Sequence, residues 1–211
     1  MIKISSKLDN IKVISVESHT ILVKEKYWRK FYETENEIEN IFNGKDEIKI
    51  SRKEIIDEKN NKTRILKTLM WGYPKARHSK NIKAILERIE TVEEILQNIK
   101  DKNLSQNEAE EYIQQLFGIS GLGMSTCSKF LYFFGVSIDQ KKCLIFDRCI
   151  VSTLNPPFSN FILDTSNTWE QDLIHYYYYI NRVNEVSSEM NVTPDQVELF
   201  LFNFAKMIMK L

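Results

Sequence analysis

The sequence predicts a mainly α-helical protein, and two observations favour this fold class. The 211 residues are 43% hydrophobic, which is enough to build a sizeable core. Four capping-box patterns mark helix starts, and each is followed by apolar residues at helical spacing. These boxes are Thr91–Glu94, Ser105–Glu108, Thr168–Gln171 and Thr193–Gln196, the last with Pro194 at the first helical position.

Extended segments are expected only near the N-terminus, at residues 3–4, 11–16 and 47–50. Asn155-Pro156-Pro157 ends a segment, since two prolines cannot continue a helix, and an irregular connection follows to about Asn167. We expect a single two-lobed helical unit across residues 1–211. Its parts are an N-terminal segment (1–58), a basic and aromatic helical region (59–104), a helix-hairpin-helix segment (105–154) and C-terminal helices (155–211).

Composition argues against wholesale disorder, a membrane span and a metal site. Lys+Arg and Asp+Glu both number 29, so the formal net charge is zero. The longest apolar run, residues 130–138, is far shorter than the roughly 20 residues of a bilayer span. The N-terminus has no apolar signal core, and Cys127, Cys143 and Cys149 form no zinc-binding pattern. We therefore expect a cytoplasmic protein with reduced thiols and no metal.

The charge is unevenly distributed along the chain. Residues 59–83 hold eight bases and no acid, whereas residues 31–58 hold nine acids and four bases. A surface that faces a polyanion would produce this pattern. A helix with a solvated basic face explains it equally well.

Four of the six glycines (Gly118, Gly121, Gly123 and Gly135) lie within 18 residues. Gly118 follows an amphipathic helix, where a left-handed residue is expected. Gly121 and Gly123 predict a tight turn, and the next helix is expected to begin near Ser125 or Thr126. The result is a helix, a hairpin and a second helix, whose exposed amides would bind a phosphate of any nucleotide sequence.

These residues resemble the helix-hairpin-helix DNA glycosylases, particularly the adenine-DNA glycosylase and endonuclease III branch. The resemblance rests on Ser120-Gly121-Leu122-Gly123-Met124-Ser125-Thr126-Cys127 and, further along, on Leu144-Ile145-Phe146-Asp147-Arg148-Cys149-Ile150. It covers residues 110–154 and implies an all-helical fold. It also implies that Gly121, Gly123, Ser125 and Thr126 contact DNA. The endonuclease III branch has C-terminal cluster cysteines that this sequence lacks, so we expect no iron–sulfur cluster and no other cofactor.

The resemblance assigns the catalytic carboxylate to Asp147. A fixed carboxylate can stabilise the positive charge that develops on a sugar when its glycosidic bond breaks. The alternative is an ordinary aspartate that caps the short helix expected at residues 148–154.

A second site residue, Lys129, stays open between two roles. Bifunctional family members carry a Schiff-base lysine where this sequence has Ser125, so we expect a monofunctional enzyme. Lys129 lies one helical turn on and precedes Asp147 by 18 residues, near the spacing of the 8-oxoguanine glycosylases. A partly buried lysine can attack the sugar carbon, so AP-lyase activity through Lys129 is the alternative. A phosphate contact or a solvated surface position explains Lys129 equally well.

Aromatic and cationic residues gather around the turn at Gly72 and Pro74. Such a mixture suits an extruded base and its flanking phosphates. Trp71 and Tyr73 are candidates for stacking on the base, Lys75 and Arg77 for phosphate contacts, and His78 for either role. Core packing of Trp71 and Tyr73 is the alternative. A second aromatic cluster, residues 27–32, is better explained by packing.

We therefore expect a monomeric DNA glycosylase that extrudes a damaged or modified base from double-stranded DNA and cleaves its bond to deoxyribose. The main alternative is a non-catalytic hairpin module that binds DNA in repair or defence. A helical protein-interaction domain would require the hairpin and the basic segment to be coincidences. The sequence leaves open which base is excised and whether the role is repair or defence against invading DNA.

Overall fold

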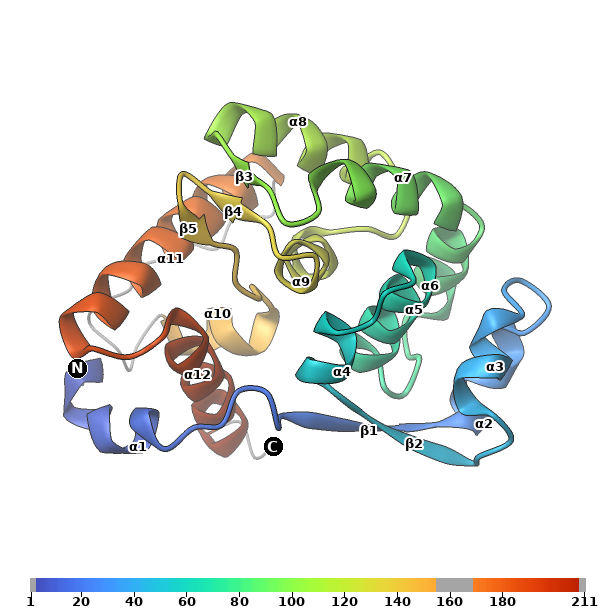
Figure 1. The fold of residues 1–211 in the computed structure, drawn as a ribbon, viewed down its shortest axis with the longest axis horizontal. Helices are drawn as coiled ribbons and strands as arrows, with labels where there is room; N and C mark the ends of the chain where they lie inside the picture. The colour runs from blue at the N-terminus through green and yellow to red at the C-terminus, as the bar shows by residue number, and fades with distance from the viewer. Residues whose placement is uncertain (1–2, 155–168, 209–211) are drawn as a thin grey trace.

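The computed structural model describes residues 3–154 and 169–208, and its fold is mainly α-helical, which confirms the predicted fold class (Figure 1). The first helices are η1 (Ile4–Lys7), α1 (Leu8–Lys12), α2 (Glu25–Trp28), η2 (Arg29–Phe31), α3 (Glu37–Phe42), α4 (Arg52–Ile56), α5 (Asn61–Gly72) and α6 (Ser79–Leu86). The later ones are α7 (Ile89–Ile99), α8 (Gln106–Phe117), α9 (Met124–Phe133), α10 (Arg148–Leu154), α11 (Trp169–Met190) and α12 (Pro194–Ile208).

The strands are short and form two small sheets. An antiparallel ribbon pairs β1 (Thr20–Lys24) with β2 (Glu47–Ser51), with Thr20 opposite Ser51. In the second sheet β4 (Ser137–Ile138) pairs in parallel with β3 (Asn103–Leu104) and antiparallel with β5 (Lys141–Lys142). No helix within residues 3–154 and 169–208 is long and apolar enough to cross a membrane.

Helix α9 lies at the centre of the fold (Figure 1). It packs against α5, α8, α4 and α11, and every side chain from Thr126 to Phe133 is buried. A helix enclosed on all sides is normally apolar all round, as Phe130 and Leu131 are here. Lys129 is therefore a charged residue in an otherwise enclosed helix.

Helices α10, α11 and α12 lie with α1 on one side of α9, and α4, α5 and α6 lie on the other side (Figure 1). Helix α12 packs against α10, α11 and α1, so the C-terminal helix is joined to the N-terminal residues. The loop after β5 leads from the second sheet to α10 and carries a buried run, Cys143 to Phe146. Asp147 follows this run at the start of α10.

A fully buried ion pair connects the two sides around α9. Both side-chain amino groups of Arg52, on α4, donate to the carboxylate of Glu198, on α12, at 2.8 and 2.9 Å. Arg52 also donates to the hydroxyl of Tyr132, on α9, at 3.2 Å. That hydroxyl donates to Asp195 at 2.8 Å, and Asp195 accepts from Lys142 at 2.7 Å. The charges are thus paired inside the core, where an unpaired charge is costly.

Several predicted boundaries differ from the structure. The expected extended segments at residues 3–4 and 11–16 are wrong, because residues 4–12 form η1 and α1 with Ile4 and Ile11 buried on one side. The segment at residues 47–50 is confirmed as part of β2. The break at Asn155-Pro156-Pro157 and the connection to Asn167 lie outside the described residues, as does Thr168.

The capping boxes also had mixed outcomes. Those at Ser105 and Thr193 are confirmed, each with the reciprocal pair of bonds between its two residues. The box at Thr91 is wrong, because α7 begins at Ile89, where the buried positions already start. A box that we did not predict caps α4 through Ser51 and Glu54.

The buried ion pair predicts that losing one of its charges costs more stability than losing both. Replacing Glu198 by alanine leaves the Arg52 charge buried without its partner. We therefore expect the free energy of unfolding, measured in urea, to fall by about 3–5 kcal/mol. The double variant Arg52→Met with Glu198→Leu removes both charges and should lose less stability than the single variant. Equal or greater loss in the double variant would contradict this account.

Candidate active site

The glycine turn between α8 and α9 is a close contact between backbones. Gly121 has φ +91°, and a Cβ there would lie 2.6 Å from the carbonyl oxygen of Asn81, on α6. Only glycine fits this position. The expected left-handed Gly118 is wrong, because its φ of −64° ends α8 in a right-handed conformation.

Helix α9 begins two to three residues earlier than predicted. Its N-cap is Gly123, so Ser125 and Thr126 lie in its first turn rather than at the cap. The amides of Thr126 and Cys127 donate to the carbonyl oxygen of Gly123. Among the described residues, no acceptor bonds to the amides of Gly123, Met124 and Ser125. A Cβ on Gly123 would face open space. The hairpin therefore presents amides at the positive end of α9, as expected for a phosphate contact.

Lys129 lies one turn further along α9, with 6% of its surface exposed. Its Nζ donates to the carbonyl oxygen of Ser125 at 2.8 Å and contacts the Ser125 hydroxyl at 2.9 Å. The carbon chain of Lys129 passes over Gly72, where a Cβ would lie 3.1 Å from Cδ. A side chain at position 72 would therefore crowd the lysine. The alternative that Lys129 is a solvated surface residue is wrong.

Asp147 caps α10 and also faces Lys129. Its Oδ1 accepts from the amide of Ile150 at 3.1 Å, so it caps α10. Its Oδ2 lies 3.8 Å from the Nζ of Lys129, which makes an ion pair. The preceding residue is anchored to α9, because the amide of Phe146 donates to the Ser128 hydroxyl at 3.0 Å. One oxygen of the carboxylate thus caps α10, and the other faces the amine of Lys129.

The electrostatics of Lys129 follow from this placement. Burial lowers the pKa of its ammonium below the ordinary value of 10.5, and the negative charge of Asp147 opposes that shift. A lowered pKa increases the fraction of neutral amine, which is the nucleophilic form. The arrangement therefore brings together an amine whose pKa is lowered and a carboxylate that can stabilise positive charge.

The three aromatic side chains within residues 71–78 differ in how deeply they are buried. Trp71 is buried, with its ring edge-on to Phe133 and to His19, so it packs in the core in this conformation. Tyr73 is half-buried, and its hydroxyl is 2.5 Å from that of Thr126. His78 is exposed and lies edge-on to Tyr73. The packing alternative therefore fits Trp71 better than base stacking does.

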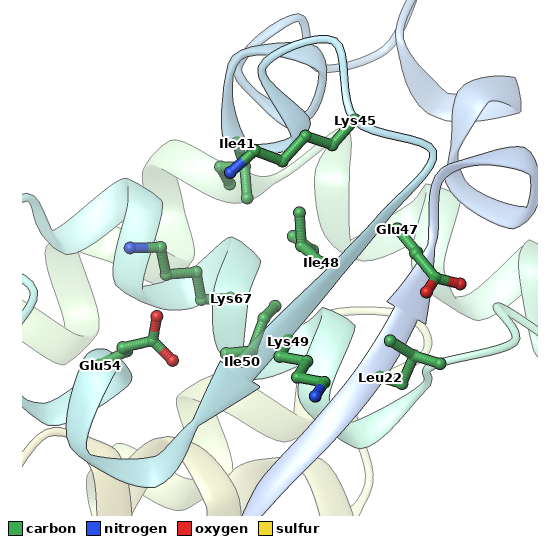
Figure 2. Close-up of a pocket in the computed structure, with 9 residues that line it drawn as sticks. All are labelled: Leu22, Ile41, Lys45, Glu47, Ile48, Lys49, Ile50, Glu54 and Lys67. Carbon is green, nitrogen blue, oxygen red and sulfur yellow. The ribbon is translucent and has the colours of Figure 1, made fainter.

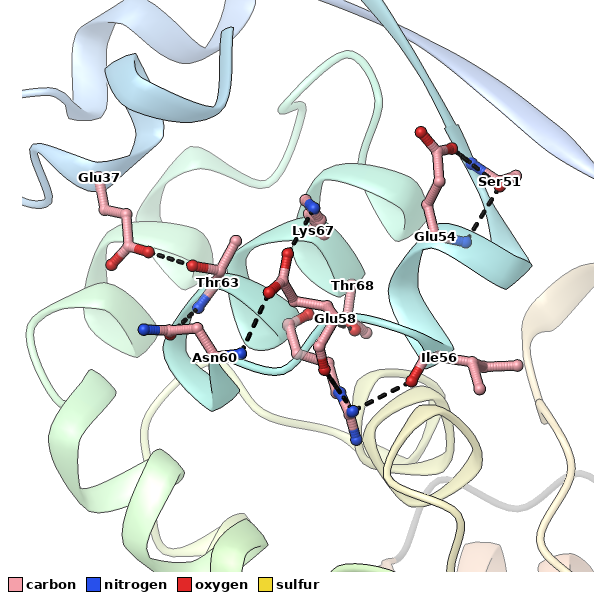
Figure 3. A network of polar contacts seen from close by, with 10 residues as sticks. Glu37, Ser51, Glu54, Ile56, Glu58, Asn60, Thr63, Lys67 and Thr68 are labelled. Carbon is pink, nitrogen blue, oxygen red and sulfur yellow. Dashed lines mark hydrogen bonds and ion pairs between the residues drawn. The ribbon is translucent and has the colours of Figure 1, made fainter. Parts of the chain in front are cut away.

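The basic segment divides into engaged and exposed residues. Lys67 pairs with Glu58, and Arg64 donates to the carbonyl oxygens of Glu58 and Ile56 (Figure 3). Lys62 pairs with Glu35 and Lys83 with Glu87. The exposed bases Lys59, Lys75, Arg77 and Lys80 make no ion pair within the described part of the chain. Three of these four surround the turn beside the hairpin.

Sequence reasoning missed two residues that shape the site. Gly72 leaves room for the Lys129 side chain, and Ser128 holds the chain just before Asp147. A signal was present for Gly72, since it is one of few glycines and lies at a helix end. Ser128 had no signal, because a serine in an apolar helix has many explanations.

A cavity of about 490 Å³ lies elsewhere, between the β1–β2 ribbon and α5 (Figure 2). Its lining includes Ile48, Ile50, Lys45 and Lys67 and none of the predicted site residues. Within the described ranges no group of three His, Cys, Asp or Glu side chains could hold a metal ion.

The pairing of Lys129 with Asp147 predicts the direction of a pKa change. In an NMR titration of labelled lysine, Lys129 should titrate below 10.5. Its pKa should fall further in Asp147→Asn, because that variant removes a charge that favours the ammonium. The control Asp139→Asn, at an exposed position, should leave it unchanged. A rise in the Lys129 pKa in Asp147→Asn would show that the two groups do not interact as placed.

Comparison with known proteins identifies the family. No curated protein and no solved structure matches the chain. A family model described as "Putative 8-oxoguanine DNA glycosylase OGG-like protein" matches residues 14–202, which include the hairpin, Lys129 and Asp147. This finding confirms the resemblance to the helix-hairpin-helix glycosylases. Because the match spans most of the sequence, the chain belongs to this OGG-like family.

Proposed function

We propose that this protein excises 8-oxoguanine from double-stranded DNA, with Lys129 as the nucleophile and Asp147 as the stabilising carboxylate. The observation that carries the proposal is the buried Lys129 amine 3.8 Å from the Asp147 carboxylate, one turn behind the hairpin. The base is taken from the name of the family whose model matches residues 14–202.

The chemistry begins with the neutral amine of Lys129. Its lone pair attacks C1′ of the damaged nucleotide, the glycosidic bond breaks, and the bonding electrons leave with the base, which takes up a proton. The C1′–O4′ bond then breaks, O4′ takes up a proton that Nζ releases, and the opened sugar is held as an imine between Nζ and C1′. Loss of a proton from C2′ expels the 3′ phosphate, which is the AP-lyase step.

Asp147 supports this reaction through its charge. The sugar becomes positively charged as the base leaves, and a carboxylate fixed beside C1′ stabilises that charge. Capping of α10 fixes the direction of the carboxylate. The reaction therefore uses the oxygen that faces Lys129.

The DNA strand is held by the hairpin and by the loop next to it. The amides of Gly123, Met124 and Ser125 suit one phosphate, and exposed Lys75 and Arg77 suit the neighbouring ones. His78 is exposed and is the best placed of the three aromatic candidates to meet a base. Membership of a DNA glycosylase family supports DNA as the partner.

The role of Asp147 is tested by Asp147→Asn. Asparagine keeps an oxygen for the cap on α10 but removes the charge, so folding should be retained. We expect excision from an 8-oxoguanine duplex to fall on the order of 100-fold or more. The control Asp139→Asn alters an exposed aspartate outside the site and should keep full excision. Full activity of Asp147→Asn would exclude Asp147 from the chemistry.

The role of Lys129 is tested by trapping with borohydride. The reagent reduces the imine to a stable amine, so the wild-type protein should become covalently linked to damaged DNA. Lys129→Gln should form no adduct, whereas Lys142→Gln should form it normally. Excision without any adduct would favour the hydrolytic, monofunctional reaction predicted from Ser125. Binding without excision of any modified base in a panel of duplexes would favour the non-catalytic module.

A further inference from the structure

The loop between α5 and α6 and the first two residues of α6, together residues 73–80, carry the exposed bases Lys75, Arg77 and Lys80. We call residues 73–80 the basic loop. At its centre Ala76 is 1% exposed and has φ +45°, a left-handed conformation that alanine rarely adopts. An L-residue keeps this conformation only where its surroundings impose it. Lys75 and Arg77 flank Ala76, so its conformation sets the directions in which both side chains leave the loop.

A side chain from a distant part of the chain contacts this residue. Lys30, on η2, donates from Nζ to the carbonyl oxygen of Ala76 at 3.3 Å and to the hydroxyl of Ser79 at 2.6 Å. The Ser79 hydroxyl in turn donates to the same carbonyl oxygen at 3.1 Å. Two donors therefore converge on the carbonyl of the left-handed residue. Among the described residues, Lys30 makes no ion pair with a carboxylate, so its charge is directed at the loop.

Both ends of the basic loop are attached to the hairpin. The Tyr73 hydroxyl lies 2.5 Å from that of Thr126, in the first turn of α9. Beyond the other end, the backbone of Asn81 is in contact with Gly121. With Lys30 holding the middle, the exposed cations and the hairpin amides have fixed relative positions.

We propose that Lys30 is a positioning residue that holds the basic loop in the conformation in which Lys75 and Arg77 meet DNA phosphates in register with the hairpin. The proposal rests on the DNA binding of the proposed function. It assigns Lys30 no phosphate of its own, although the side chain is cationic and exposed. This distinction can be measured, because each phosphate contact contributes to the salt dependence of binding.

The experiment compares variants in binding to a duplex with a stable abasic-site analogue over a range of salt concentrations. Lys30→Gln should bind about 3- to 10-fold more weakly at fixed salt, as expected for loss of one hydrogen-bonding group. The slope of log K against log salt should stay that of the wild type. In Lys75→Gln the magnitude of this negative slope should decrease by about 0.9, the value for one lost phosphate contact. Ser79→Ala should resemble Lys30→Gln, and Lys30→Arg should restore part of the affinity.

Lys26→Gln is the matched control. Lys26 is an exposed lysine one turn before Lys30, with its Nζ over the ring of Tyr27, and within the described residues it makes no hydrogen bond or ion pair with the basic loop. Its replacement should leave affinity and slope unchanged. With the 8-oxoguanine duplex, Lys30→Gln should raise KM more than it lowers kcat, and hydrogen exchange should accelerate in residues 73–80 but not in α8.

Two results would overturn the proposal while leaving the proposed function intact. In one, Lys30→Gln lowers the slope as Lys75→Gln does, which makes Lys30 a phosphate contact. In the other, Lys30→Gln matches the wild type in affinity and in hydrogen exchange. Absence of duplex binding by the wild-type protein at low salt would overturn both proposals together.

Discussion

The site depends on keeping an ammonium group inside the protein beside a carboxylate. A buried lysine is unfavourable unless its charge is compensated, and here Ser125 and Asp147 supply that compensation. The contacts come from two elements, α9 and the start of α10, and the Lys129 side chain also needs the space left by Gly72 on α5. The pair therefore exists only when three segments that are distant in sequence have come together.

The same helix contacts a second group of buried charges, on α4 and α12. Tyr132 follows Lys129 by three residues, so both lie on one side of α9, and Tyr132 bonds to Arg52 and Asp195. The Arg52–Glu198 pair joins α4 to α12 across this side. The helix that holds the amine is thereby fixed between the two sides of the molecule. Charged residues that are costly to bury thus determine how the helices meet around the site.

Local sequence patterns predicted the parts of the fold that local physics determines. The boxes at Ser105 and Thr193 cap real helices because their bonds involve only neighbouring residues. Gly121 was predicted as a tight turn because a left-handed position next to another backbone requires glycine. The short helix at residues 148–154 was also predicted with its observed bounds. The extended segments expected at residues 3–4 and 11–16 were wrong, because this part of the chain forms η1 and α1, and α1 packs against the distant α12, which no local pattern indicates.

The candidate site could be predicted only in part for the same reason. The spacing of Lys129 and Asp147 indicated a pair, but their 3.8 Å separation depends on the route of the chain through β4 and β5. Trp71 was predicted as a stacking residue from its neighbours in sequence, whereas its burial depends on Phe133, His19 and Arg52. Half of the basic segment is engaged by acids or carbonyl groups that sequence alone does not place nearby. Lys30 could not be recognised, because its partners at Ala76 and Ser79 are more than forty residues away.

The central claim is that Lys129 and Asp147 flank the sugar of the damaged nucleotide. A crystal structure of the protein with a duplex that contains an uncleavable abasic-site analogue tests it most directly. The account predicts that C1′ of the analogue lies within reach of Nζ of Lys129 and beside the free carboxylate oxygen of Asp147, with the adjacent phosphate on the hairpin amides. An analogue bound at another surface, or a sugar that cannot approach the amine, would contradict it.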